Sequence, residues 1–341
     1  MSRFLFRIDV SPSTGVGHLK RCLSLGRELA DLGGDIYFLC RADGFDVSRY
    51  MAPMVREWRP MEWSTEPGDD AGEVVRMYGS KKIDTAIIDH YRADEEYQRV
   101  LYGSGIRWLQ FDGTARYPIW SDWVLNMSPD ASRSLYDNLL RKENTLLLLG
   151  PTYAVLRKEF EGRRALSDKT EVRRILLTFG GGDDRGATIF CLKAIEGLDD
   201  NVERIVLMSS TNPQKGKILE WCEGHANTRV LIDTNEMASH MASADLGITA
   251  GGTTVFEMAT LGVPILILQI ADNQVPISGA WERRGYGVNV GPLDYLRQEV
   301  MLQETISLME DESRRRAMSD IGRTLVDGRG TRRVVEALLA S

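Results

Sequence analysis

A histidine lies in a glycine-containing turn near the start of the chain, and its type and position suggest proton chemistry. His18 follows Gly15-Val16-Gly17, between an apolar run over 4–8 and a helical pattern. Glycines at a strand-to-helix turn let the backbone approach a ligand, and the first helical amides can bind an anion. Histidine exchanges a proton near neutral pH, so His18 is a candidate general base, with Gly17 and Arg21 as candidate ligand contacts. The alternative is a histidine that only hydrogen-bonds its own loop.

A second group of polar residues follows another apolar run. Asp89, His90 and Tyr91 come directly after the run 85–88, which has the composition of a buried strand. Active-site residues gather at the carboxyl ends of parallel strands. If this strand neighbours the first one, Asp89 or Tyr91 can orient His18 or an attacking water, since a base held by a third group is a recurring catalytic arrangement. The alternative is an ordinary strand end in which Asp89 caps the next helix.

The second half of the chain also contains a glycine-rich turn. Gly180-Gly181-Gly182 follows an apolar run and has the glycine content of a turn that lets the backbone approach a ligand. It lacks the Lys-Ser/Thr pair of a P-loop and the spacing of a dinucleotide fingerprint. Farther along, Asn273 and Gln274 come after another apolar run and are candidates for contacts with a sugar. In both places the alternative is a turn or solvated loop without a ligand.

The turn at Gly252-Thr253-Thr254 is followed by a glutamate with two competing interpretations. In one, the three amides hold a diphosphate and Glu257 accepts two hydrogen bonds from a ribose diol. In the other, Thr254 and Glu257 form a Thr-x-x-Glu capping box, which needs no ligand. Both interpretations use the same carboxylate, because a capping glutamate folds back onto its own helix.

Apolar runs alternate with helical stretches along the whole chain, which predicts parallel sheets covered by helices on both faces. The predicted strands are 4–10, 35–39, 85–88, 107–111, 123–125 and 145–149 in the first half, and 174–179, 204–208, 229–232, 245–249 and 264–269 in the second. The first predicted helix carries Cys22, Leu25, Leu29 and Leu32 at helical spacing. Because each half begins with a strand, a glycine turn and a helix, we predict the α/β class, with two doubly wound, Rossmann-like domains facing a cleft. We expect these domains to span 1–155 and 156–341.

Composition excludes several classes of protein. The 341 residues include 42 Lys and Arg against 49 Asp and Glu, so the chain is mildly acidic and unsuited to bulk binding of nucleic acid. The four cysteines form no Cys-x-x-Cys, which argues against a zinc site or disulfide framework and for a reducing compartment. The longest apolar run, 263–270, is too short to span a bilayer, and the N-terminus has no leader pattern. We expect a cytoplasmic protein with no metal, no cofactor, no nucleic-acid partner and no stable membrane insertion; the oligomeric state is left open.

Together these motifs resemble those of GT-B fold enzymes related to the lipid II N-acetylglucosaminyltransferase. The closer resemblance is to the UDP-2,4-diacetamido-2,4,6-trideoxy-β-L-altropyranose hydrolases of pseudaminic acid biosynthesis and their spore-coat polysaccharide relatives. It covers nearly the whole chain, and its most specific part is the Gly-Pro-x-Tyr-Ala-x-Leu-Arg-x-Glu-Phe stretch at 150–160. Its other carriers are 15–22, 88–91, the Gly180 turn, 250–257 and Asn273-Gln274.

The resemblance implies roles for many of these residues. In that family the histidine matching His18 is the proposed general base, the tyrosine matching Tyr91 lies beside it, and the glutamate matching Glu257 binds the nucleotide ribose. The turns matching Gly181 and 252–254 form the diphosphate site, and the loop matching 232–237 holds the uracil. The catalytic candidates are therefore His18, Tyr91 and Asp89. The candidate substrate or nucleotide contacts are Gly17, Arg21, Asn126, Arg157, Gly181, Gly182, Ile232, Met237, Gly252, Thr253, Thr254, Glu257, Asn273 and Gln274.

The residues and the resemblance together predict metal-independent hydrolysis of a nucleotide sugar, with a UDP-sugar as substrate and UDP as product. His18 takes a proton from water, the water attacks the anomeric carbon of an acetamido or deoxy sugar with inversion, and UDP leaves. One alternative is a GT-B glycosyltransferase that uses the same histidine on the hydroxyl of a sugar or lipid-linked acceptor. Another is a protein that senses nucleotide sugars, which would keep the Glu257 region and would not need His18.

Overall fold

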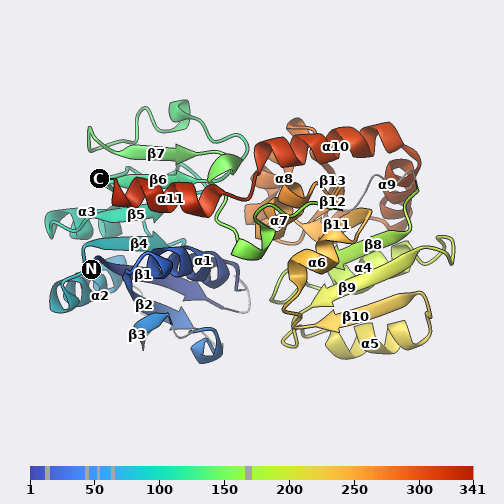
Figure 1. Cartoon of the computed structure of the whole chain (residues 1–341), viewed down its shortest axis with the longest axis horizontal. Helices are drawn as coiled ribbons and strands as arrows, with labels where there is room; N and C mark the ends of the chain where they lie inside the picture. Colours follow the sequence, from blue (N-terminus) through green and yellow to red (C-terminus); the bar gives the residue numbers. More distant parts are fainter. Residues whose placement is uncertain (12–15, 43–45, 52–53, 63–65, 166–170, 341) are drawn as a thin grey trace. The chain divides into compact units, whose positions relative to one another are not determined.

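The computed structural model describes residues 1–11, 16–42, 46–51, 54–62, 66–165 and 171–340. They form two compact units, each built around its own parallel sheet (Figure 1). Unit 1 comprises Met1–Arg157 and Arg329–Ser341, and unit 2 comprises Lys158–Gly328. The predicted α/β fold with two doubly wound, Rossmann-like domains is confirmed.

The described part of unit 1 contains a seven-stranded sheet in the order β3-β2-β1-β4-β5-β6-β7, with every pair parallel. Its strands are β1 (Arg3–Val10), β2 (Asp35–Ala42), β3 (Val55–Pro60), β4 (Thr85–Asp89), β5 (Trp108–Phe111), β6 (Trp123–Asn126) and β7 (Leu146–Leu149). The strand order reverses between β1 and β4, where Ile8 lies beside Asp89. In doubly wound sheets, ligands bind at such a reversal, outside the carboxyl ends of the strands.

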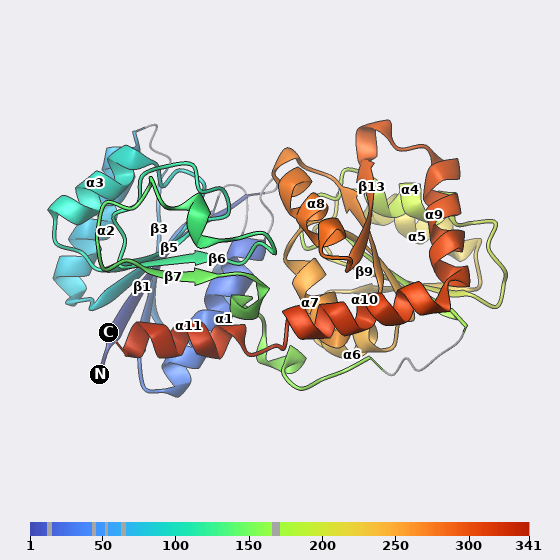
Figure 2. The same cartoon turned by 90° about the horizontal axis from the view of Figure 1, so that it is seen from above.

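Helices cover both faces of this sheet (Figure 2). One face carries α1 (Gly17–Asp31) and α11 (Gly330–Leu339), and the other carries α2 (Pro67–Lys81) and α3 (Glu95–Gly103). Side chains of β1 alternate between two cores, so Phe6 and Ile8 pack toward α1 while Leu5 packs toward α2 and α3. Leu32, expected in the buried stripe of α1, is exposed because the helix ends at Asp31.

The helix at the C-terminal end of the chain packs in unit 1, which corrects the expected second domain of 156–341. Val334 and Leu338 of α11 are buried in the same core as β1 and α1. The Thr331 hydroxyl accepts a hydrogen bond from the Leu156 N–H at 3.0 Å and donates one to the Leu156 carbonyl at 2.8 Å. The amphipathic pattern of this segment predicts a helix but does not say which of two cores receives its apolar face. The chain passes from unit 1 to unit 2 after Arg157, close to the expected boundary at 155.

The described part of unit 2 contains a six-stranded parallel sheet in the order β10-β9-β8-β11-β12-β13. Its strands are β8 (Arg174–Thr178), β9 (Glu203–Met208), β10 (Thr228–Ile232), β11 (Leu246–Ala250), β12 (Ile265–Gln269) and β13 (Gly287–Pro292). Its helices are α4 (Ala187–Ala194), α5 (Lys215–Glu223), α6 (Met237–Ala242), α7 (Thr253–Leu261), α8 (Val275–Arg283), α9 (Gln298–Glu310) and α10 (Glu312–Leu325). Helix α4 packs beside α5 and α9, and α7 packs beside α6 and α10. The order of this sheet reverses between β8 and β11.

Candidate active site

The candidate base lies in the first turn of α1, next to the reversal in strand order. The helix begins at Gly17, and His18 is buried. Gly15, the first glycine of the predicted turn, lies outside the described residues. Because β1 and β4 are neighbours, the end of β4 comes close to the start of α1. The strand adjacency on which the pairing of His18 and Asp89 depends is therefore present.

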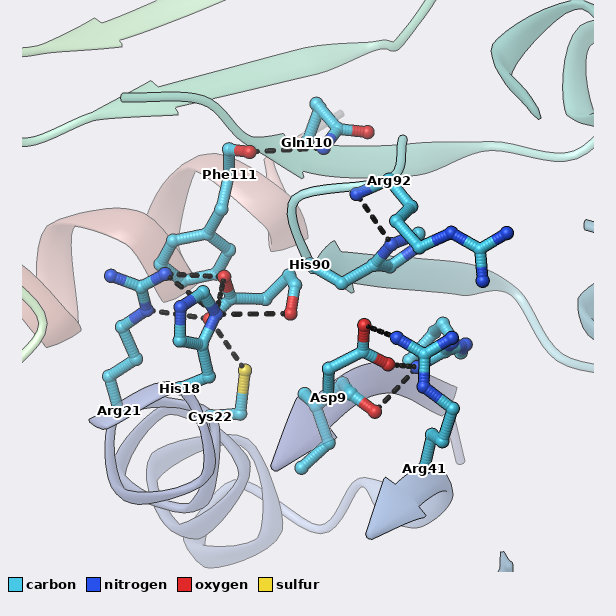
Figure 3. A network of polar contacts seen from close by, with 12 residues as sticks. Asp9, His18, Arg21, Cys22, Arg41, His90, Arg92, Gln110 and Phe111 are labelled. Carbon is cyan, nitrogen blue, oxygen red and sulfur yellow. Dashed lines mark hydrogen bonds and ion pairs between the residues drawn. The ribbon is translucent and has the colours of Figure 1, made fainter. Parts of the chain in front are cut away.

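Three side chains from one face of α1 contact the Asp89 carboxylate. They are His18, Arg21 and Cys22, which are labelled in Figure 3. His18 Nδ1 lies 2.7 Å from Asp89 Oδ1, and Arg21 Nε donates to Asp89 Oδ2 at 2.6 Å. A second N–H of Arg21 donates to Oδ1, and the Cys22 thiol makes a longer contact of 3.5 Å with Oδ2. Positions three and four residues after His18 share its helix face, which brings all three donors to one carboxylate.

Asp89 does not cap the following helix. The N-cap of α3 is Asp94, whose side chain accepts a hydrogen bond from the Tyr97 N–H at 3.0 Å. The alternative interpretation of Asp89 as a helix cap is therefore wrong, and its carboxylate is directed to α1.

The charge of Asp89 determines which nitrogen of His18 can act as a base. Burial alone would raise the pKa of Asp89, but the Arg21 guanidinium and then His18 outweigh it and hold that pKa well below its usual value. An ionised carboxylate only accepts hydrogen bonds, so we assign the proton of a neutral His18 to Nδ1. Nε2 is then left with a lone pair that can accept a proton. The arrangement is a base oriented by a third group.

Two aromatic rings complete the surroundings of His18 and Arg21. The rings of His18 and Tyr91 meet edge to face, with centroids 5.0 Å apart and planes at 72°. Tyr91 is 57% exposed, so the residue that contacts His18 also borders solvent. The Arg21 guanidinium lies over the Phe111 ring at 4.7 Å. Sequence reasoning named Tyr91 but missed Phe111, which comes from another strand, and Cys22, which helical spacing from His18 would have found.

The remaining candidates of unit 1 are placed differently. Asn126 is buried at the end of β6, where its amide nitrogen donates to the Tyr136 hydroxyl at 2.9 Å and its oxygen accepts from the Ser128 N–H at 3.0 Å. These contacts hold the turn after β6. Arg157 lies half-buried at the end of the first segment of unit 1.

The candidate nucleotide contacts of unit 2 gather along the carboxyl edge of its sheet, because each follows a parallel strand. Gly181 and Gly182 follow β8, Gly252, Thr253 and Thr254 follow β11, Asn273 and Gln274 follow β12, Ile232 ends β10, and Met237 begins α6. Strands β8 and β11 are neighbours at the reversal of the strand order. The two glycine turns therefore flank the position at which doubly wound sheets bind ligands.

The start of α7 does not match the capping box suggested for Glu257. The helix begins at Thr253 with Gly252 as its N-cap, and glycine has no side chain to cap the helix amides. Thr254 lies inside the first turn, so the Thr254–Glu257 capping box is wrong, because its threonine would have to be the N-cap. The Val255 amide donates to the Gly252 carbonyl, and the amides before it lie at the start of the helix, where anions bind in other proteins. The half-buried Glu257 follows one turn later.

The basic residue of the Gly180 turn is bound within the protein. Arg185 donates to both carboxylate oxygens of Asp294, at 2.9 and 3.0 Å, and to the Ile270 carbonyl at 3.0 Å. These contacts tie together the segments that follow β8, β12 and β13. Arg185 therefore organises this edge of the sheet in the structure described.

The described ranges also bear on metal binding and membrane insertion. Within them, no group of three or more His, Cys, Asp or Glu side chains could hold a metal ion. No helix in the same ranges combines the length and apolar composition needed to cross a bilayer.

Comparison with known proteins confirms both the resemblance and the fold. The chain is 26% identical over 270 residues to the spore coat polysaccharide biosynthesis protein SpsG of Bacillus subtilis, covering 78% of this chain and 79% of that protein. It is 25% identical over 288 residues to the UDP-2,4-diacetamido-2,4,6-trideoxy-β-L-altropyranose hydrolase of Campylobacter jejuni, covering 84% of this chain and 98% of that protein. No protein-family model matches the chain.

The solved structure of Acinetobacter baumannii MurG matches with a TM-score of 0.69 at 17% identity, covering 99% of this chain and 100% of MurG. The GT-B fold predicted from the sequence is therefore confirmed.

Proposed function

We propose that this protein is an enzyme that hydrolyses a UDP-linked sugar and releases UDP. The observation that carries the proposal is the His18–Asp89 pair, a buried carboxylate that holds an imidazole at the reversal point of a doubly wound sheet. The relationship to a UDP-sugar hydrolase along most of both chains supports this substrate class. A protein that only senses nucleotide sugars would have no use for a base oriented in this way.

In the proposed reaction, His18 and the two glycine turns of unit 2 have separate tasks. Nε2 of His18 takes a proton from water, and the water oxygen forms a bond to the anomeric carbon. The bond between that carbon and the diphosphate oxygen breaks, and UDP leaves with the electron pair. We assign the diphosphate to the amides at Gly181 and 252–254, where helix and turn N–H groups stabilise negative charge. A positioned general base contributes roughly 10²–10⁴-fold in rate, so stabilisation of the leaving group must supply much of the remainder.

His18 is the base that Asp89 orients among the described residues, and this supports a single displacement. Water then enters opposite the departing diphosphate, and the anomeric configuration inverts. Glu257 is assigned to the ribose diol, Asn273 and Gln274 to the sugar, and the 232–237 loop to the base. Arg21 was expected near an anion, and its partner in the structure is Asp89, so we assign it to orienting the carboxylate.

A glycosyltransferase is the second candidate, because the fold is shared with solved glycosyltransferases. Such an enzyme would use His18 to deprotonate an acceptor hydroxyl in place of water. The two functions differ in one observable, which is release of UDP when no acceptor is present.

The test is incubation of the purified protein with a panel of UDP- and CDP-sugars in ¹⁸O-labelled water, without any acceptor and with EDTA in a parallel sample. We expect one UDP-sugar to be hydrolysed in both samples, with label in the free sugar and the inverted anomer seen first by NMR. Label in the nucleotide product would show attack at phosphorus and overturn the mechanism. Turnover that requires an added acceptor would establish the transferase instead, and activity that EDTA abolishes and magnesium restores would overturn the metal-independent reaction.

A further inference from the structure

Three consecutive residues at the end of β4 point alternately to the two faces of the sheet. Asp89 and Tyr91 both contact His18 on the α1 side. His90 lies between them and packs on the other side, where its ring meets Tyr97 of α3 edge to face with centroids 4.8 Å apart. In Figure 3 the His90 ring points away from the His18 group and toward Arg92. His90 is thus joined to two site residues through the backbone without touching His18.

One hydrogen bond of His90 closes the turn that follows β4. Its Nδ1 accepts the N–H of Arg92 at 3.2 Å, an interaction from residue i to residue i+2 that encloses Tyr91. The His90 side chain is 5% exposed and is held by Tyr97, so the acceptor has little freedom to move. The direction in which the backbone leaves β4, and with it the placement of Tyr91, therefore depends on this contact.

Buried charges face His90 from the neighbouring elements and nearly balance one another. Arg7 donates to Asp70 at 2.8 Å and to Asp9 at 2.6 Å, and Asp9 also accepts from Arg41. Burial first, and then the positive charge of Arg7, lowers the pKa of His90 to about 3. A neutral imidazole keeps the Nδ1 lone pair that accepts the Arg92 N–H, so the turn does not open through titration of His90 near neutral pH.

The second ring nitrogen of His90 indicates that the hydrogen bond from Arg92 is the polar interaction for which this side chain is used. With Nδ1 as acceptor, we assign the proton to Nε2. Nε2 is buried and has no hydrogen-bond partner within the described ranges. A buried polar atom without a partner costs stability, so a residue kept only to fill space against Tyr97 would be better replaced by an apolar one.

We propose that His90 is a positioning residue that holds the 89–92 turn so that Asp89 and Tyr91 both contact His18. The proposal rests on the proposed function for its activity readout, and it has a spectroscopic readout that does not. The competing interpretation is a histidine that only fills the core beside Tyr97.

Two substitutions separate these interpretations because they remove opposite features of the side chain. His90→Phe keeps a ring for packing against Tyr97 but has no acceptor for the Arg92 N–H. His90→Asn loses the ring but supplies an oxygen that accepts the N–H of residue i+2, as asparagine does in Asx-turns. We expect the Phe variant to have the higher melting temperature and the Asn variant the higher kcat. The kcat of the Phe variant should fall by about ten- to a hundredfold with a smaller change in KM, because a small misplacement of catalytic groups has such an effect.

The second readout is the low-field proton NMR signal of the His18 Nδ1–H bonded to Asp89, assigned by its loss in His18→Asn. It should persist in His90→Asn and be lost or shifted in His90→Phe, or in His90→Leu if the Phe variant does not fold. If the native protein hydrolyses no UDP-sugar, the proposed function fails while this signal still tests the positioning role. A kcat in the Phe variant equal to or above that of the Asn variant, or a signal unchanged in the variants without an acceptor, would overturn the proposal.

Discussion

Replacing Asp89 with asparagine tests how the carboxylate and the base work together. The substitution preserves size and removes the charge on which His18 and Arg21 converge. Asparagine can present its amide N–H to His18, which would move the imidazole proton from Nδ1 to Nε2. Nε2 could then no longer accept a proton from water.

The burial of Asp89 and Arg21 determines how large the expected losses of stability and turnover are. The Asp89 side chain is 2% exposed and that of Arg21 is 17% exposed, so the variant leaves a largely buried guanidinium without its counter-charge. Breaking a buried pair by removing one partner costs about 3–5 kcal/mol in the free energy of unfolding. Turnover should fall by at least about a hundredfold, the lower end of what a positioned general base contributes.

The double variant Asp89→Asn/Arg21→Gln separates the two effects. It removes both charges, so its loss in unfolding free energy should be smaller than the sum of the losses of the two single variants. The expected difference is about 0.5–3 kcal/mol. Its turnover should stay low, because the imidazole is still without a carboxylate. Urea unfolding and UDP release, measured on all variants, provide the two quantities. Turnover of Asp89→Asn within tenfold of the native protein would refute the role assigned to the carboxylate, and strictly additive stability losses would refute the coupling to Arg21.

Three further perturbations test other parts of the reasoning. His18→Asn removes the base while keeping a polar side chain, so turnover should fall at least about a hundredfold with UDP affinity by calorimetry little changed, and near-native turnover would remove His18 from the mechanism. Glu257→Ala should weaken UDP binding by about 2 kcal/mol, as for a hydrogen bond to a charged group, with little change in melting temperature; intact binding with reduced stability would give Glu257 a structural role. For acid unfolding, the folded protein holds His90 neutral to a pKa of about 3, whereas the unfolded chain protonates it near 6.5, so the unfolded state binds the extra proton between these values. Stability should therefore fall as the pH drops from 6.5 toward 3, by up to about 1.4 kcal/mol per pH unit from this group, and the same slope in His90→Asn would contradict this assignment.

The central strands were predictable from the sequence, and so were two of the four edge strands, β7 and β10. Inner parallel strands are buried on both faces and read as continuous apolar runs, as in β4 and β11, where every residue is buried. The other two edge strands, β3 and β13, were missed. Strand β3 mixes half-buried with exposed residues, and β13 contains two glycines, so neither has a periodic apolar signal.

The sequence was enough to predict which residues belong to the site, but less so to predict which of them contact one another. His18 was identified from its glycine turn, and Asp89 because it follows a buried run. Their pairing depended on which strands are neighbours, and that is fixed only by the folded sheet. Arg21 was expected near an anionic ligand, which stays a prediction; its contact with Asp89 was not expected, and it arises because its position on α1 brings it to the same carboxylate as His18. The role of His90 was hidden for the same reason: the residues that face it come from elements distant in the sequence.

The return of α11 to the first core sets the order in which a nascent chain can complete its two units. Unit 2 is a continuous insertion within unit 1, so the ribosome synthesises all of Lys158–Gly328 before it reaches Arg329. Until then, the core that receives Val334 and Leu338 stays uncovered beside β1 and α1. The unit that begins synthesis first is therefore the last to be completed, and a polypeptide stalled before residue 330 carries a finished unit 2 attached to a unit 1 with an exposed apolar face.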